Sequence, residues 1–100
     1  MIISIDRAGV ATLDDIDNLR AFKVSAACDA DGIARALSGF GRLDAEGHAW
    51  ISRAWLLAKG RPDDAKWLAG FGAMQDYALA HGWVDLATDS IRAHVEYASS

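Results

Sequence analysis

The sequence predicts an α+β fold in which strands and hairpins from the two ends of the chain form an antiparallel sheet. A central pair of helices, including one long helix at about 63–81, packs on one face of that sheet. Two observations carry this prediction: residues 63–81 show helical spacing, and residues 91–97 alternate strictly between apolar and polar side chains. Strands at both ends with helices between them are typical of an antiparallel sheet covered on one side.

The long helix has recognisable signals at both ends. Pro62 suits the first turn, two aspartates follow it near the positive end of the helix dipole, and Gly82 suits a left-handed C-cap. Gln75 lies near the centre of the predicted apolar face, where a buried amide needs a hydrogen-bonding partner. That face comprises Trp67, Leu68, Phe71, Met74, Ala78 and Leu79.

A shorter helix precedes the long one. Ser52 is placed to cap it and Gly60 to end it, and the connector before Pro62 is so short that the two helices should form an antiparallel pair. Opposite its aromatic side, the long helix carries a stripe of small residues: Ala65, Ala69, Ala73 and Ala80. Small side chains permit close contact, so we expect this stripe to pack on the shorter helix or on a second subunit.

Two segments share one nine-residue pattern. Residues 5–13 read Ile-Asp-x-x-Gly-x-Ala-x-Leu, and residues 43–51 read Leu-Asp-x-x-Gly-x-Ala-x-Ile. Aspartate at the first and glycine at the fourth position favour a type I turn, so each segment predicts a β-hairpin. For the second segment an alternative stays open, in which Asp44 caps a helix that runs to Lys59.

The other segments give shorter patterns. Residues 12–22 resemble a capped helix start and predict a short helix, although a strand within residues 12–28 stays open. The alternation at residues 22–26 predicts a strand, and residues 33–37 predict a short helix. Trp83 and Val84 are expected to pair with the last strand as a hairpin.

Length and composition limit the classes of function. The 100 residues, 52% hydrophobic and 24% charged, predict a single globular domain over residues 1–100. The net charge is −4 and the basic residues do not cluster, which argues against a nucleic-acid partner. No apolar run reaches membrane-spanning length, so we expect no membrane partner. Cys28 is the single cysteine, and with no secretory signal it predicts a soluble, cytoplasmic protein.

Three side chains form the strongest candidate metal cluster. His94 and Glu96 share one face of the last predicted strand, and His48 would join them if the strands are neighbours. Their spacing matches no zinc motif, so we predict no metal and no other cofactor. Cys28 lies among small apolar residues and is interpreted as core filling rather than as a nucleophile.

These observations lead to two hypotheses about function. The first is a non-catalytic protein that acts through self-association as a homodimer, using sheet edges or the alanine stripe. The second is a small-molecule-binding or enzymatic domain with a pocket between the sheet and the long helix, lined by Trp50, Trp67, Gln75 and His94. The sequence leaves open whether the protein is an enzyme.

Overall fold

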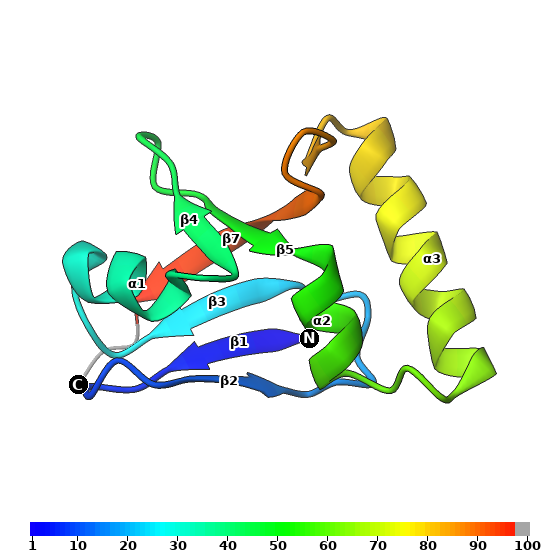
Figure 1. The fold of residues 1–100 in the computed structure, drawn as a ribbon, viewed down its shortest axis with the longest axis horizontal. Helices are drawn as coiled ribbons and strands as arrows, with labels where there is room; N and C mark the ends of the chain where they lie inside the picture. Colours follow the sequence, from blue (N-terminus) through cyan, green and yellow to red (C-terminus); the bar gives the residue numbers. More distant parts are fainter. Residues whose placement is uncertain (98–100) are drawn as a thin grey trace.

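A computed structural model describes residues 1–97 of the protein as an α+β fold. A curled mixed sheet is accompanied by three helices (Figure 1). Within residues 1–97, no helix has the length and apolarity needed to cross a bilayer. The elements in chain order are β1 (Ile2–Ile5), β2 (Ala11–Asp14), β3 (Lys23–Ala26), α1 (Ala30–Leu37), β4 (Gly41–Leu43), β5 (Ala49–Ser52), α2 (Arg53–Lys59), α3 (Ala65–Ala80), β6 (Val84–Asp85) and β7 (Ser90–Tyr97).

The sheet has the strand order β2-β1-β3-β7-β5-β4, and β6 pairs with β7. The predicted antiparallel sheet is wrong at its centre, because β1, β3 and β7 run parallel to one another. The reason lies in the connection after β2. This strand returns antiparallel to β1, and residues 15–22 then lead the chain to the side where β1 begins. The next strand therefore starts beside Met1, whose amino group donates a hydrogen bond to the carbonyl oxygen of Ala21 at 2.7 Å.

The short helix predicted at residues 12–22 is also wrong. Thr12 and Asp14 lie on the exposed side of β2, while Ala11 and Leu13 are half-buried. The polar residues that resemble a helix cap are thus the outer face of a strand. Asp15 then adopts a left-handed conformation with φ of 49°, and residues 15–22 form turns and extended segments.

Both predicted hairpins are confirmed, and they use the same turn. The carboxylates of Asp6 and Asp44 each accept hydrogen bonds from the backbone N–H groups two and four residues later, all at 2.9 Å. Gly9 and Gly47 close the turns with φ of 80° and 87°, a conformation that glycine adopts without steric cost. The alternative helix from Asp44 to Lys59 is therefore wrong.

The helices α1 and α2 cover one face of the sheet (Figure 1). As predicted, Ser52 caps α2 and accepts a hydrogen bond from the backbone of Trp55 at 3.3 Å. The last strand and the β6–β7 hairpin are also confirmed. The core lies mainly between these helices and the sheet, and the largest fully buried side chains are Phe71, Met1, Ile3, Ile5, Ile33, Leu37, Ile51, Leu56, Ile91 and Val24.

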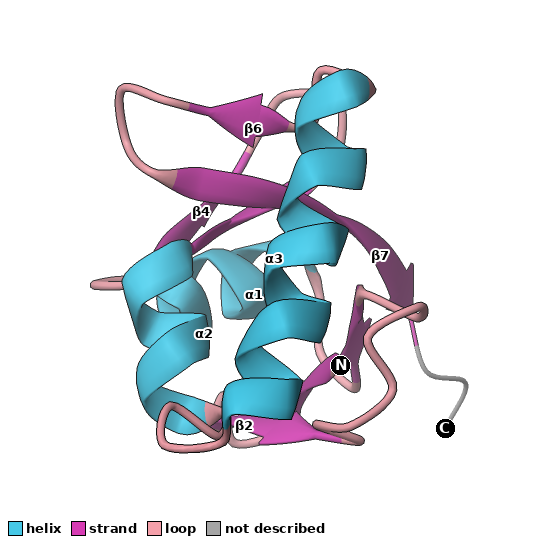
Figure 2. Cartoon of the chain, turned by 90° about the vertical axis from the view of Figure 1, so that its right-hand side faces the viewer, coloured by secondary structure: helices cyan, strands magenta, loops and turns pink. Residues whose placement is uncertain are grey.

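The long helix is confirmed but takes a different position from the predicted one. It stands beside the ends of the strands rather than flat on the sheet face, with α2 alongside (Figure 2). Asp64 is its N-cap, so Pro62 precedes the helix, and Gly82 follows it with φ of 75°, as predicted. Its buried residues, Trp67, Phe71 and Ala78, form a narrower face than expected.

Two of the predicted core residues on α3 are exposed instead. Leu68 and Leu79 keep 38% and 54% of their surface accessible. The alanine stripe, Ala65, Ala69, Ala73 and Ala80, is exposed along its whole length and does not pack on α2. The helices α2 and α3 contact each other near the connector between them, where the ring of Trp67 packs over Gly60. The outer side of α3 is therefore unusually apolar for an exposed helix surface.

Candidate functional site

A cavity of about 770 Å³ opens between α3 and the sheet. Its walls come from the 15–22 segment, the start of β5, α3 and the β6–β7 hairpin. Most of the lining is apolar, and no aspartate or glutamate contributes to it. The lining residues are Leu19, Arg20, Phe22, His48, Gly70, Ala73, Met74, Tyr77, Ala78, Trp83, Ile91, Arg92 and His94.

The cavity lies where the sheet splits. β5 and β6 both pair with Ser90 and Ile91 of β7, so they occupy opposite edges of that strand. β3 pairs with residues 94–97 on the edge away from β5, which is the edge of β6. The backbone N–H of Arg92 still donates to the carbonyl of Trp83 at 2.8 Å, so this edge of β7 passes from the β6 segment to β3 at Ala93, and α3 stands beside this point.

Aromatic side chains form one wall of the cavity. Trp83 stacks on His81 with ring centroids 4.7 Å apart, and the ring of Tyr77 meets Trp83 edge-on at 5.9 Å. Gly82 turns the chain sharply enough to bring Trp83 back against the last turn of α3, where its backbone N–H donates to the carbonyl of Ala78 at 2.8 Å. The guanidinium carbon of Arg92 lies 5.3 Å from the centre of the Trp83 ring, within the range of a cation–π interaction.

Arginine and tryptophan alternate across the strands next to the cavity. Trp50 of β5 is in register with Arg42 of β4 on one side and with Arg92 of β7 on the other. The guanidinium of Arg42 lies 5.1 Å from the Trp50 ring and also pairs with Asp85 at 3.0 Å. The indole N–H of Trp50 donates to Asp44 at 2.8 Å. This bond, together with the backbone N–H of His48, holds the pKa of the Asp44 carboxyl below its ordinary value.

The two histidines of the predicted metal cluster do line the same cavity, but the cluster does not form. Ala49 pairs with Ala93, so His48 and His94 occupy the next register position on one side of the sheet. His48 Nδ1 lies 3.8 Å from an Asp44 oxygen and 3.9 Å from a Glu46 oxygen, too far for hydrogen bonds. Across residues 1–97, no three histidine, cysteine or acidic side chains lie close enough to hold a metal ion.

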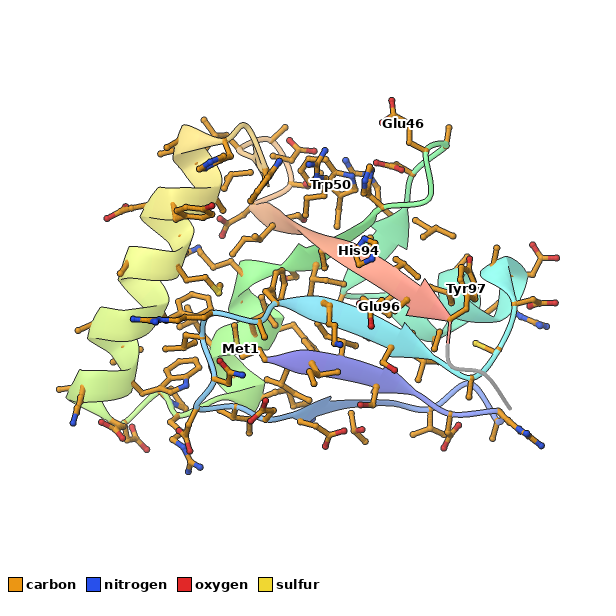
Figure 3. The ribbon with its side chains drawn as sticks, turned by 180° about the vertical axis from the view of Figure 1, so that it is seen from behind. Met1, Glu46, Trp50, His94, Glu96 and Tyr97 are labelled. Carbon is orange, nitrogen blue, oxygen red and sulfur yellow. The ribbon has the colours of Figure 1, made fainter. Side chains whose placement is uncertain are left out.

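Glu96 is engaged elsewhere. It accepts a hydrogen bond from Lys23 of the neighbouring strand at 2.9 Å, and this pairing lowers the pKa of its carboxyl. His94 Nε2 lies 3.9 Å from the other Glu96 oxygen. Both residues project from the sheet face that α1 and α2 leave uncovered (Figure 3).

Of the four predicted ligand-binding residues, the structure brings only His94 to the cavity. Trp67 is 4% exposed and structural: it stacks on Phe71, and its indole N–H donates to the carbonyl of Ile16 at 2.9 Å. Trp50 is in register with the cavity residue Arg92 but does not line the cavity itself, and its indole N–H donates to Asp44. Gln75 is half-buried but outside the cavity, because the buried face of α3 centres on Phe71 and Ala78 and leaves Gln75 at its edge.

Sequence reasoning missed the basic and aromatic residues of the cavity. Arg20 lies in residues 12–22, which the sequence predicts as a short helix. Arg92 lies in the predicted last strand, residues 91–97, and Trp83 in the segment expected to pair with it. The signal was present in the last two: a hairpin between residues 83–84 and the strand places Trp83 beside Arg92, whose neighbour on the same face is His94.

Comparison of the chain with protein-family models, with curated protein sequences and with solved structures finds no match to any of them.

Proposed function

We propose that the protein binds a small molecule in the cavity between α3 and the sheet. The observation that carries the proposal is the cavity itself. Its volume of about 770 Å³ falls in the range of small-molecule sites, which enclose roughly 300–1,000 Å³. Its lining also has the usual composition of such sites, a mainly apolar surface with a few polar groups that fix orientation.

The residues that line this cavity differ from those predicted from the sequence for the ligand pocket. His94 stays, while Trp50, Trp67 and Gln75 are replaced by Trp83, Tyr77 and the two arginines. The segment 15–22 closes one side of the cavity through Leu19 and Phe22, and Leu19 also packs against Gly70 of α3. Binding therefore depends on contacts between segments about 50 residues apart in the chain.

Screening a fragment library by ¹H–¹⁵N NMR tests this proposal. Ligands should shift the Gly70 amide and the Trp83 indole signals. Ala73→Trp places a bulky side chain at the cavity and should abolish those shifts. Ala69→Trp, one turn earlier on the exposed side of α3, is the matched control and should retain them. A screen without any ligand, or ligands indifferent to Ala73→Trp, would count against the proposal.

We also propose that the protein associates as a homodimer through the outer side of α3. The specific support is that residues 68–80 include only one charged side chain, Asp76, although Leu68 and Leu79 and the alanines outside the cavity, Ala69 and Ala80, are exposed. A surface of this kind lets two copies of a helix approach closely around a twofold axis. This role is non-catalytic, and the cytoplasmic location predicted from the single cysteine stays part of the same proposal.

Light scattering coupled to size-exclusion chromatography tests the dimer. We expect a dimeric mass at micromolar concentration, and Leu79→Lys should convert it to a monomer. Leu86→Lys is the control, because Leu86 is 79% exposed but lies in the β6–β7 loop. A monomeric wild-type protein at these concentrations rejects the dimer without affecting the binding proposal.

A further inference from the structure

The ionisable groups of the cavity wall are basic, against the overall charge of the chain. Two arginines and two histidines line the cavity, and no aspartate or glutamate within residues 1–97 is among the lining residues, whereas the chain as a whole has 14 acidic residues and 10 lysines and arginines. Each histidine has a carboxylate oxygen within 3.9 Å, so the positive charge of the wall comes from the two arginines. An apolar cavity with low-dielectric walls strengthens the effect of these two charges on a bound ligand, which makes the wall complementary to a negative group.

Within residues 1–97, Arg20 and Arg92 have no acidic partner, as is also true of Arg7 and Arg35 outside the cavity. Arg42, Arg53 and Arg61 each pair with an aspartate at 2.7–3.0 Å. Within residues 1–97, neither cavity arginine forms an ion pair or donates a side-chain hydrogen bond. Their guanidinium groups consequently keep their donors available for a ligand.

Arg92 is placed against an aromatic ring of the cavity wall. Its guanidinium carbon lies 5.3 Å from the centre of the Trp83 ring, within the range of a cation–π interaction. The N–H donors of a guanidinium point outward in its plane and match the two oxygens of a carboxylate or phosphate. The contact with Trp83 limits the positions open to the Arg92 guanidinium and so lowers the entropic cost of binding an anion.

The rest of the lining matches a flat apolar body. Tyr77, Trp83 and Phe22 contribute aromatic atoms to the wall, and Leu19 and Met74 supply further apolar contacts. Aromatic groups bind to such surfaces through stacked or edge-on contacts. Two arginines neutralise one anionic group, which separates this site from the extended basic surfaces that bind nucleic acids.

We infer that the ligand of this cavity is an organic anion, with a flat aromatic body among Tyr77, Trp83 and Phe22 and its carboxylate or phosphate on Arg20 and Arg92. This inference rests on the proposed binding function and names the chemical class of the ligand. Carboxylate and phosphate share the chemistry that the two arginines recognise, so the experiment includes both.

Isothermal titration with matched probes tests the inference. The probes are 2-naphthoate, 2-naphthyl phosphate, the neutral 2-naphthamide and the cationic 2-naphthylmethylamine, which share one aromatic body and differ in charge. We expect at least one anion to bind about tenfold tighter than the amide, because charge-assisted hydrogen bonds from a guanidinium are stronger than those to a neutral acceptor. The amine should bind most weakly. The preferred anion identifies whether the site selects carboxylates or phosphates.

Arginine variants test whether Arg20 and Arg92 cause the preference for anions. Arg20→Gln and Arg92→Gln should each weaken binding of the preferred anion about tenfold and leave amide binding within about twofold. The unchanged amide affinity also shows that the cavity is intact. Arg35→Gln is the control, because Arg35 is exposed on α1 away from the cavity and should leave both affinities unchanged.

Other results separate this inference from the proposed function. If the amide binds as tightly as the anions, or if both cavity variants leave anion binding unchanged, the anion inference is wrong while small-molecule binding survives. The same holds if no naphthyl probe binds but the NMR screen finds ligands that Ala73→Trp excludes. If neither experiment detects a ligand, both proposals are wrong.

Discussion

The two hairpins share a turn but occupy opposite positions in the sheet. In the first hairpin, the strand before the turn, β1, lies inside the sheet and the strand after it, β2, forms an edge. In the second, β4 before the turn forms the edge and β5 after it lies inside. The corresponding residues differ accordingly: Leu13 is half-buried, whereas its counterpart Ile51 is fully buried.

The comparison shows that one local pattern can determine a turn without determining its surroundings. The aspartate that opens each turn accepts the same two backbone hydrogen bonds. Asp44 alone also accepts a hydrogen bond from a tryptophan, Trp50, and the following histidine lines the cavity. The second hairpin thus connects its turn to the candidate site, while the first one does not.

The largest difference in stability between the two hairpins is expected for substitutions in their strands. Ile51→Ala should lower the free energy of unfolding by about 2–5 kcal/mol, because it leaves a cavity in the core. Leu13→Ala should cost less, since Leu13 is half-buried on an edge strand. For the strands that precede the turns, the first hairpin should be the more sensitive one, so that Ile5→Ala lowers the free energy of unfolding more than Leu43→Ala. Urea denaturation measures all four, and equal costs at Leu13 and Ile51 would contradict the assigned strand order.

The turn glycines should behave alike in both hairpins. Gly9→Ala and Gly47→Ala each force a side chain into a left-handed conformation, which costs roughly 1–2 kcal/mol, and no atom lies within 4 Å of either added carbon. Gly72→Ala is a control of opposite sign, because its helical site is equally open and alanine favours helices by up to about 1 kcal/mol. Thermal unfolding of the three variants checks this. Clearly unequal costs at Gly9 and Gly47 would show that the turns are not locally determined.

Substitution of the turn aspartates should affect stability differently in the two hairpins, by a smaller amount. Asparagine retains one acceptor oxygen for the backbone N–H groups, but its amide nitrogen cannot accept the Trp50 indole proton. Asp6→Asn should therefore change stability by at most about 0.5 kcal/mol, and Asp44→Asn should be the more destabilising change. A double-mutant cycle with Trp50→Phe measures the coupling. An equal effect of Trp50→Phe in the wild-type and Asp44→Asn backgrounds would mean that the indole bond contributes nothing.

Acidification should remove the contribution of Asp44 to stability, and this is the smallest of the effects that we expect. The folded pKa of Asp44 lies below its ordinary value of 3.8, so its contribution to stability is present above that pH and is lost as the pH falls through the lowered pKa. The difference in melting temperature between wild type and Asp44→Asn should therefore be constant near pH 6 and shrink towards pH 2. A difference that grows on acidification would contradict this assignment.

The candidate site is only partly predictable from the sequence. The β6–β7 hairpin was predictable, and with it the proximity of Trp83 and Arg92, because alternation in the last strand is strict. Arg20 was not predictable, because the polar residues after Thr12 resemble a helix cap when read as a local pattern. The position of Gln75 was misjudged because helical spacing alone does not say which part of a broad apolar surface is buried. Leu68 and Leu79 belong to the exposed part.

The sequence by itself determined the two aspartate–glycine turns, the Ser52 cap, the C-cap at Gly82 and the last strand. Each of these depends on hydrogen bonds or alternation within a few residues, so local chemistry is sufficient. Only the tertiary structure decided that β1, β3 and β7 run parallel, that α3 stands at the end of the sheet, and that Arg20 and Arg92 share a cavity with Trp83. These features arise from contacts between distant segments, whose relative positions are set by the packing of the whole core.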